Sequence, residues 1–145
     1  MKILIVTQYY FPEQFQINEI APELVRRGHE VTVLCGVPNY PKGIIFQGYE
    51  TADNRKQKEM EYYKQTGVRV IHAKQHPRGH NPFSMLKNYF SFVKNSKEVV
   101  RNLPSNFDVV LGYQLSPITS MYAAVEYKKL YGTPLMYYTL DLWPV

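Results

Sequence analysis

Ile17-Asn-Glu-Ile-Ala-Pro-Glu-Leu-Val-Arg-Arg-Gly-His-Glu-Val-Thr-Val-Leu34, together with the earlier apolar run Ile3-Leu-Ile-Val6, is the stretch that decides the fold class. The two segments alternate as strand, polar loop, helix, glycine stop and strand, which is the opening unit of a parallel, doubly wound α/β sheet. Ligands of such sheets bind at the carboxyl ends of the strands. The loop between Val6 and Ile17 is therefore expected to face a binding site.

The composition of this loop narrows the ligand class. Gln8-Tyr-Tyr-Phe-Pro-Glu-Gln-Phe-Gln16 contains no glycine, so it matches neither the dinucleotide-binding turn nor the phosphate loop of nucleotide hydrolases. Its aromatic and amide side chains suit stacking against, and hydrogen bonding to, a neutral polar ring such as a sugar. The alternative is an ordinary surface loop whose aromatic side chains pack back onto the sheet.

Length and composition favour one domain. The 145 residues, 45% of them hydrophobic, are enough for a single core, and we assign residues 1–145 to one domain. The first apolar run is too short for a secretory signal and no later run reaches membrane-spanning length, which predicts a cytoplasmic protein. Cys35 is the only cysteine, which excludes an internal disulfide and multi-cysteine metal sites. We expect no metal and no cofactor.

The charge balance is moderately basic. Seventeen Lys and Arg residues against twelve Asp and Glu residues give a formal net charge of +5, which fits an anionic partner such as an anionic lipid or a phosphorylated substrate. The chain carries no zinc-finger, helix-turn-helix or RNA-binding signature. Nucleic acid is therefore the least favoured partner.

The hydrophobic pattern predicts a Rossmann-like parallel sheet of about five strands with helical crossovers. The first helix ends at Gly28, and Pro22 requires that it begin near Asn18 or Glu19 or be distorted. The segment 37–67 has weak periodicity; Gly36–Gly43 reads as a shaped turn, and Asn54–Gln65 as either a short helix or a flexible flap. The expected strands are Lys2–Thr7, Glu30–Gly36, Val68–Ala73, Phe107–Gly112 and Pro134–Leu140.

A second helix is predicted over Pro82–Leu103. Its core-facing residues recur at helical spacing, and a separate arc carries a basic stripe flanked by two phenylalanines. This arc suits contact with a membrane surface, and the alternative is a solvated helix face. The core-facing set is Met85, Leu86, Tyr89, Phe92, Val93, Val100 and Leu103, and the membrane-contact set is Phe83, Lys87, Phe90, Lys94, Lys97 and Arg101.

A third helix is predicted to open with Ser116 as N-cap and Pro117 in the first helical position, and to run to about Tyr131. The fifth strand then leads to Asp141. Among the residues near the strand ends, only His72, Asp141 and the more distant Glu13 could perform acid–base chemistry. No Ser-His-Asp arrangement or metal-ligand spacing is present, so a hydrolase is poorly supported.

Several motifs resemble one enzyme family. Met1-Lys-Ile-Leu-Ile-Val-Thr-Gln-Tyr-Tyr-Phe-Pro-Glu13, the Ile17–Leu34 stretch, Gly36-Val-Pro-Asn-Tyr-Pro-Lys-Gly43 and Asp141-Leu-Trp-Pro144 look like the amino-terminal half of a family 4 glycosyltransferase. The resemblance is greatest to the branch that builds bacterial capsule, O-antigen and colanic acid polysaccharides, which includes fucosamine transferases. It extends over essentially the whole chain.

The resemblance implies a GT-B architecture, in which two Rossmann-like domains face each other and the amino-terminal one holds the acceptor. In that family the transfer retains anomeric configuration and needs no metal, and the nucleotide-sugar donor belongs to the carboxyl-terminal domain. The E-x(7)-E motif of that second domain is absent from this sequence. We therefore expect this chain alone to be inactive, and to need a donor-binding domain or a separate donor subunit.

The resemblance also assigns roles to residues. Asp141 is expected to orient a reacting hydroxyl as the catalytic candidate, and its alternative role is the cap of a following helix. The acceptor is expected to be a lipid-linked saccharide at the inner membrane face, which would place the protein in the cytoplasm, peripheral on that membrane. The expected acceptor-binding residues are Gln8, Tyr9, Tyr10, Glu13, Gln14, Asn39, Tyr40, Gln114 and Ser116.

Two other functions compete with this one. The chain could be a standalone, non-catalytic subunit that binds or recruits a separate donor domain at the membrane. It could also be a different doubly wound ligand-binding domain, such as a nucleotide sensor. The glycine-free first loop argues against the sensor, because it lacks a phosphate-binding turn.

Overall fold

A computed structural model of the protein describes residues 1–115 and 117–141. Its centre is a five-stranded, all-parallel sheet in the order β3-β2-β1-β4-β5. The predicted Rossmann-like α/β class is thereby confirmed. The strands are β1 (Lys2–Val6), β2 (Glu30–Gly36), β3 (Arg69–Ala73), β4 (Val109–Gln114) and β5 (Leu135–Thr139).

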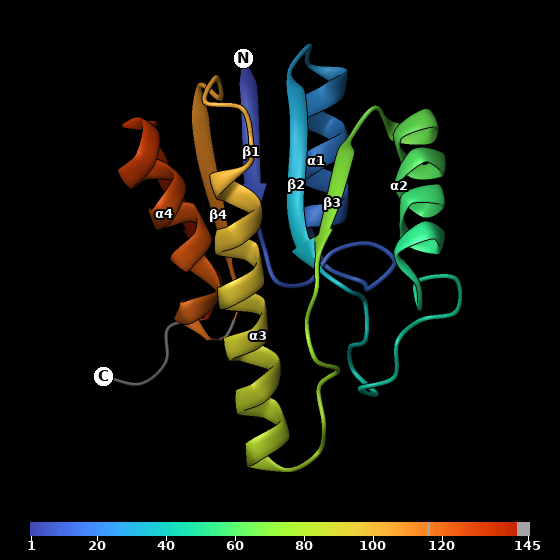
Figure 1. Ribbon diagram of the computed structural model, residues 1–145. Coiled ribbons are helices and arrows are strands. Elements are labelled where there is room, and N and C mark those ends of the chain that lie inside the picture. The colour runs from blue at the N-terminus through green and yellow to red at the C-terminus, as the bar shows by residue number, and fades with distance from the viewer. Residues whose placement is uncertain (116, 142–145) are drawn as a thin grey trace.

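Helices cover both faces of the sheet. α1 and α2 pack on one face, and α3 and α4 pack on the other (Figure 1). A short 3-10 helix, η1, leads directly into α4. The helices are α1 (Ile17–Arg26), α2 (Ala52–Thr66), α3 (Pro82–Arg101), η1 (Ile118–Met121) and α4 (Tyr122–Tyr131).

The core forms two layers, one on each side of β1. Ile3 and Ile5 belong to the layer under α1 and α2, whereas Leu4 and Val6 belong to the layer that contains Phe92 of α3. All five side chains are buried. Strands covered on both faces read as continuous apolar runs, which is why Ile3–Val6 is apolar throughout. Burying each such side chain stabilises the fold by about 1.5–3 kcal/mol.

The charged stretch 54–65 is a helix, and the alternative of a flexible flap is wrong. The helix begins at Ala52, where the hydroxyl of Thr51 accepts a hydrogen bond from the backbone N–H of Asn54 at 3.1 Å. Such a side-chain cap satisfies one of the free N–H groups at a helix start. Only Tyr62 among the helical residues is buried, so the helix shows almost no apolar periodicity.

Several predicted boundaries differ from the structure by one or two residues, and three of the differences have a physical reason. α1 begins at Ile17 and accommodates Pro22 inside the helix. β4 begins and ends two residues later than predicted, because Asp108 lies before the strand and its carboxylate accepts the N–H of Lys2 at 2.6 Å. Pro117 is not the first helical residue: it is the extended N-cap of η1, with ψ 165°. Ser116, the predicted N-cap, lies outside the described residues.

The first half of α3 runs past the carboxyl edge of the sheet (Figure 1). Leu86 was predicted to face the core, but half of its surface is exposed. The physical reason is that no strand lies beneath this part of the helix. Further along, Phe92 and Val100 are fully buried against the sheet, as predicted.

The edge strand β5, at the other side of the sheet from β3, is exposed. The β5 side chains Met136, Tyr137 and Tyr138 are all largely accessible to solvent. Tyr138 stacks on the buried Tyr113 of the neighbouring strand, with ring centroids 5.4 Å apart and nearly parallel planes. β5 therefore attaches to the sheet through β4, and its outer side is open in the described part of the chain.

Candidate functional site

Two loops at the carboxyl edge of the sheet are joined by one buried carboxylate. The first loop (7–16) follows β1 and the second (37–51) follows β2. Glu13 is 3% exposed, and its Oε2 accepts the backbone N–H of Tyr10 at 3.2 Å. Its Oε1 accepts the N–H groups of Asn39 and Tyr40, both at 2.8 Å. Glu13 thus fixes the position of one loop relative to the other.

The same carboxyl group titrates near neutral pH. Burial raises the pKa of Glu13 to about 7, and the three backbone N–H donors oppose this shift. A carboxyl group with this pKa exists as both acid and carboxylate at physiological pH. The hydrogen bonds between the loops therefore depend on the protonation state of Glu13.

Asn39 connects the second loop to a third one, the segment 74–81 that joins β3 to α3. Its amide nitrogen donates to the carbonyl oxygen of Val37 at 2.8 Å, and its amide oxygen accepts the N–H of Arg78 at 2.8 Å. Gly43 passes directly over Arg78 with a φ of +70°. A Cβ at position 43 would overlap with the carbonyl oxygen of Arg78, so the close approach of these loops requires glycine there.

A buried amide network lies beneath the loops. The amide nitrogen of Gln8 donates to the Oδ1 of Asn88 on α3 at 2.9 Å and lies 3.4 Å from the Oε1 of Gln75. Asn88 in turn donates to the carbonyl oxygen of His76 at 2.6 Å, and Gln75 donates to that of Val37 at 2.8 Å. This network connects the end of β1 to α3 and to the loops after β2 and β3.

Aromatic side chains cover this network. The ring of Tyr9 contacts those of Phe15 and Tyr40, with centroids 5.7 and 5.2 Å away, and the guanidinium of Arg78 lies 5.4 Å from the centre of Tyr40. Burial raises the pKa of Tyr9 to about 12. Within the described residues, the Tyr9 hydroxyl and the Oε1 of Gln8 are buried without a hydrogen-bond partner.

In the described part of the chain, the other half of the carboxyl edge, after β4 and β5, is more open. Gln114 at the end of β4 is mostly buried; its amide oxygen accepts the hydroxyl of Thr139 at 3.3 Å, and its amide nitrogen lies 3.4 Å from the carbonyl oxygen of Asp141. Asp141 itself is exposed. The proposed alternative role of Asp141, as a helix cap, concerns residues 142–145, which lie outside the described part.

The structure therefore brings most predicted acceptor-binding residues to one edge of the sheet, but in different environments. Six of them are buried, including Gln114 at the end of β4, whereas Tyr40 is partly buried and Gln14 is exposed. Ser116 lies outside the described residues. Contact between these side chains and an acceptor stays a prediction. The six buried residues are Gln8, Tyr9, Tyr10, Glu13, Asn39 and Gln114.

The histidine at the end of β3 has a structural partner. The side chain of His72 is 3% exposed, and its Nδ1 lies 2.7 Å from the Oε1 of Glu59 on α2. The same carboxylate oxygen accepts the backbone N–H of His72 at 3.1 Å. His72 therefore joins β3 to α2, and its ring also contacts that of Tyr49 in the second loop, with centroids 5.5 Å apart.

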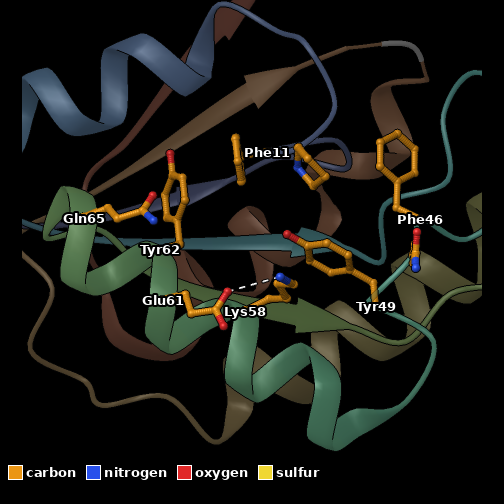
Figure 2. A pocket seen from close by; sticks show the side chains of 9 residues that line it. Phe11, Phe46, Tyr49, Lys58, Glu61, Tyr62 and Gln65 are labelled. Atoms are coloured by element: carbon orange, nitrogen blue, oxygen red, sulfur yellow. Dashed lines mark hydrogen bonds and ion pairs between the residues drawn. The ribbon is translucent and has the colours of Figure 1, made fainter.

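A pocket that the sequence did not predict opens between α2 and the first two loops (Figure 2). Its volume is about 420 Å³. The signal that could have indicated it is Tyr62, a lone buried aromatic residue in an otherwise charged stretch. The lining residues are Phe11, Pro12, Phe46, Gln47, Tyr49, Lys58, Glu61, Tyr62 and Gln65.

The predicted basic stripe on α3 is partly neutralised. Glu126 of α4 accepts two hydrogen bonds from Arg101, at 2.8 and 2.6 Å, and forms an ion pair with Lys97 at 3.5 Å. Lys87 and Lys94 are exposed, as are Phe83 and Phe90. The exposed cations of the stripe without a carboxylate partner among the described residues are therefore Lys87 and Lys94.

Neither a membrane-spanning helix nor a metal site occurs in the part of the chain that the structure describes. None of its helices combines the length and the apolarity needed to cross a bilayer. No three His, Cys, Asp or Glu side chains of residues 1–115 and 117–141 gather closely enough to hold a metal ion.

Comparisons with known proteins support the fold class of the chain but show no family for it. No family model matches the chain, and no curated protein matches it. A solved structure of the C-terminal domain of PF1911 hydrogenase from Pyrococcus furiosus is similar, with a TM-score of 0.58 and 20% identity over 94% of this chain and 89% of that one. A second structure of that domain gives a TM-score of 0.56 at 20% identity, over 94% and 90% of the two chains.

A third similar structure is MurG from Acinetobacter baumannii, with a TM-score of 0.44 and 17% identity. The match covers 94% of this chain, which spans only 33% of that one. At such identities the likeness to the hydrogenase domain establishes the doubly wound fold alone.

Proposed function

We propose that this chain binds a saccharide acceptor and presents it for transfer of a sugar from a nucleotide-sugar donor, in a retaining, metal-independent glycosyltransferase reaction of surface polysaccharide synthesis. The observation that carries the proposal is the rigid carboxyl edge, where Glu13 holds two loops rich in aromatic and amide side chains. The resemblance of the sequence motifs to family 4 glycosyltransferases supplies the reaction class.

The chemistry explains why such an edge would be useful. Displacing a nucleoside diphosphate builds positive charge at the anomeric carbon and negative charge on the leaving phosphate, so catalysis depends on electrostatic positioning in a closed cleft. The loops would contribute the acceptor half of that cleft. The donor half would come from a second domain or subunit.

In this proposal Tyr40 and Gln14 contact the acceptor, because they are the predicted acceptor-binding residues of the two loops whose side chains are not fully buried. Asp141 orients a reacting hydroxyl, because it is an exposed carboxylate at the end of the open half. Gln8, Tyr10, Glu13 and Asn39 act mainly by holding the loops in position.

The test is direct binding of a soluble, short-chain polyprenyl-diphosphate-linked N-acetylglucosamine to the chain, measured by isothermal titration calorimetry. We expect saturable binding that Tyr40→Ala weakens about tenfold, and that Gln57→Ala, a change of a polar residue on α2, leaves unchanged. Equal affinity for the sugar-free polyprenyl diphosphate would contradict the proposed saccharide recognition.

One surface fits both the proposed function and the alternative one, a non-catalytic subunit that brings a separate donor domain to the membrane. The part of α3 that extends past the sheet exposes Phe83 (78%), Phe90 (66%) and Leu86 (50%), next to Lys87 and Lys94. Exposed apolar side chains beside cations suit insertion into an anionic interface. We propose this surface as a membrane contact in either function.

Vesicles of phosphatidylglycerol and phosphatidylcholine test this contact by co-sedimentation. Phe83→Ser/Phe90→Ser should release the protein from the vesicles, and Lys87→Glu/Lys94→Glu should do so most strongly at low salt. Tyr122→Ser, at an exposed aromatic residue elsewhere, serves as the control. Unchanged sedimentation of both double variants would remove the membrane proposal.

A further inference from the structure

The pocket between α2 and the first two loops has an aromatic wall. The ring of Phe11 stacks on that of Tyr62, with centroids 4.7 Å apart and planes inclined by 30°. Phe11 remains 41% exposed, so the rest of its surface is available to a ligand. Phe46 and Tyr49 face the pocket from the second loop (Figure 2). Such flat apolar surfaces bind the C–H face of a ring by dispersion.

The rim of the pocket is polar but carries no net charge. Gln47 and Gln65 are exposed amides, each of which can both donate and accept hydrogen bonds. The two charged groups, Lys58 and Glu61, pair with each other at 3.1 Å. The rim therefore suits hydroxyl groups, which also donate and accept, better than it suits an ionic ligand.

The walls of the pocket are held in place by contacts outside it. The hydroxyl of Tyr62 lies 3.1 Å from that of the buried Tyr10, which fixes the α2 side to the first loop. The N–H of Phe46 donates to the carbonyl oxygen of Pro38 at 3.1 Å. Gly48 has a φ of +87°, and a Cβ there would press on the side chain of Lys58. A pocket with fixed walls loses little entropy when it binds a ligand.

We propose that this pocket is a saccharide subsite that binds one neutral pyranose ring, with the ring stacked on Phe11 or Phe46 and its hydroxyls bonded to Gln47 and Gln65. The inference takes from the proposed function only that the acceptor is a saccharide. Its volume of about 420 Å³ lies in the range of small-molecule sites. The subsite would hold a sugar of the acceptor other than the one that reacts at the carboxyl edge.

Nucleotides are the main competing ligand class, because bases also stack on aromatic rings. The phosphates of a nucleotide require unpaired cations or a glycine-rich turn. The one lysine that lines the pocket is paired with Glu61. The observations therefore favour a neutral sugar.

The experiment is a titration of the isotope-labelled chain with methyl glycosides of glucose, galactose and N-acetylglucosamine, with uridine monophosphate as a separate arm, followed by two-dimensional amide NMR. We expect at least one glycoside to shift the side-chain amides of Gln47 and Gln65 at millimolar concentration. Gln65→Ala and Phe46→Ala should each weaken this binding about fivefold or more. Tyr63→Ala, a change of an exposed aromatic residue outside the pocket on the same helix, should leave it unchanged.

The pattern of shifts separates the subsite from the proposed function. Shifts confined to Gln14, Tyr40 and Gln114 would overturn the subsite and leave the proposed function standing. Shifts at the pocket alone would support the subsite and count against acceptor binding at the carboxyl edge. No shift with any glycoside, shifts that persist in Gln65→Ala/Phe46→Ala, or pocket shifts with uridine monophosphate alone would overturn the subsite.

Discussion

The two halves of the carboxyl edge differ in how their polar residues are used. After β1 and β2, the polar groups of Gln8, Glu13 and Asn39 are buried and bonded within the protein. After β4 and β5, Gln114 is likewise buried and bonded, whereas Asp141 is exposed. Within the described residues, polar groups at the strand ends thus hold the loops in position in one half, and one carboxylate, that of Asp141, remains available to a ligand in the other.

This difference separates two kinds of expected mutational effect. A change in the closed half should lower the stability of the fold, since it leaves buried groups unpaired. A change in the open half should alter binding or reaction and leave stability nearly unchanged. The four predictions below follow this order.

The largest loss of stability is expected from Glu13→Ala. The change leaves the N–H groups of Tyr10, Asn39 and Tyr40 without an acceptor, and at the lower end of about 1–3 kcal/mol for each unpaired group we expect a loss of about 3–5 kcal/mol. Urea unfolding at pH 7 measures it, with Glu19→Ala on the exposed side of α1 as the control. A loss below about 1 kcal/mol would show that the loops do not depend on Glu13.

The pH dependence of stability should be the next largest effect. The pKa of Glu13 is raised from 4.5 to about 7 in the folded protein, so between these values the folded state binds more protons than the unfolded state. The free energy of unfolding contributed by this group is then fully present below pH 4.5 and is lost as the pH rises through 7, by about 2–3 kcal/mol.

To measure this contribution, the free energy of unfolding of the wild type is compared with that of Glu13→Gln by urea unfolding from pH 4.5 to 8. Because glutamine does not titrate, the free energy of unfolding of Glu13→Gln should not show this decrease between pH 4.5 and 8. Parallel profiles would contradict the assigned titration of Glu13.

A smaller effect is expected from Gln8→Leu. The change removes the donor to the Oδ1 of Asn88 and should lower stability by about 1–2 kcal/mol. Thermal unfolding compares it with Asn88→Leu and the double variant. If the two residues act through their shared hydrogen bond, the double variant should lose less than the sum of the single losses. Strict additivity would speak against the network.

The smallest effect on stability is expected from Asp141→Ala, because its side chain is exposed. We expect a change within about 0.5 kcal/mol. In an enzyme that contains both this chain and a donor domain, we expect transfer of the sugar to fall at least tenfold. A loss of folding as large as that of Gln8→Leu would instead assign Asp141 a structural role.

The sequence predicts the sheet well because β1 has a continuous apolar run, Ile3–Val6, and β1–α1–β2 has a clear glycine stop. For the segment that forms α2, the sequence did not distinguish a helix from a flexible flap, because a helix with one buried residue has no apolar period. The exposure of Leu86 could not be predicted, since it depends on how far the first half of α3 extends past the sheet. Spacing along a helix does not show what lies beneath it.

The sequence predicts which edge of the sheet carries the candidate site, but it does not predict the contacts within that site. Strand ends identify the edge, but they do not show that Glu13 and Asn39 point inward to pair with backbone groups of neighbouring loops. Those contacts join residues more than 25 positions apart, such as Glu13 and Asn39. The pocket next to α2 was missed for the same reason, because its aromatic residues come from segments without a periodic pattern.

Amide hydrogen exchange tests the central claim most directly, because it reports the two halves of the edge in one experiment. We predict that the N–H groups of Asn39 and Tyr40, which donate to Glu13, exchange nearly as slowly as core amides of β1, whereas the amide of Asp141 exchanges rapidly. Rapid exchange at Asn39 and Tyr40, at rates similar to that of Asp141, would contradict the claim that the first two loops are held in a fixed arrangement.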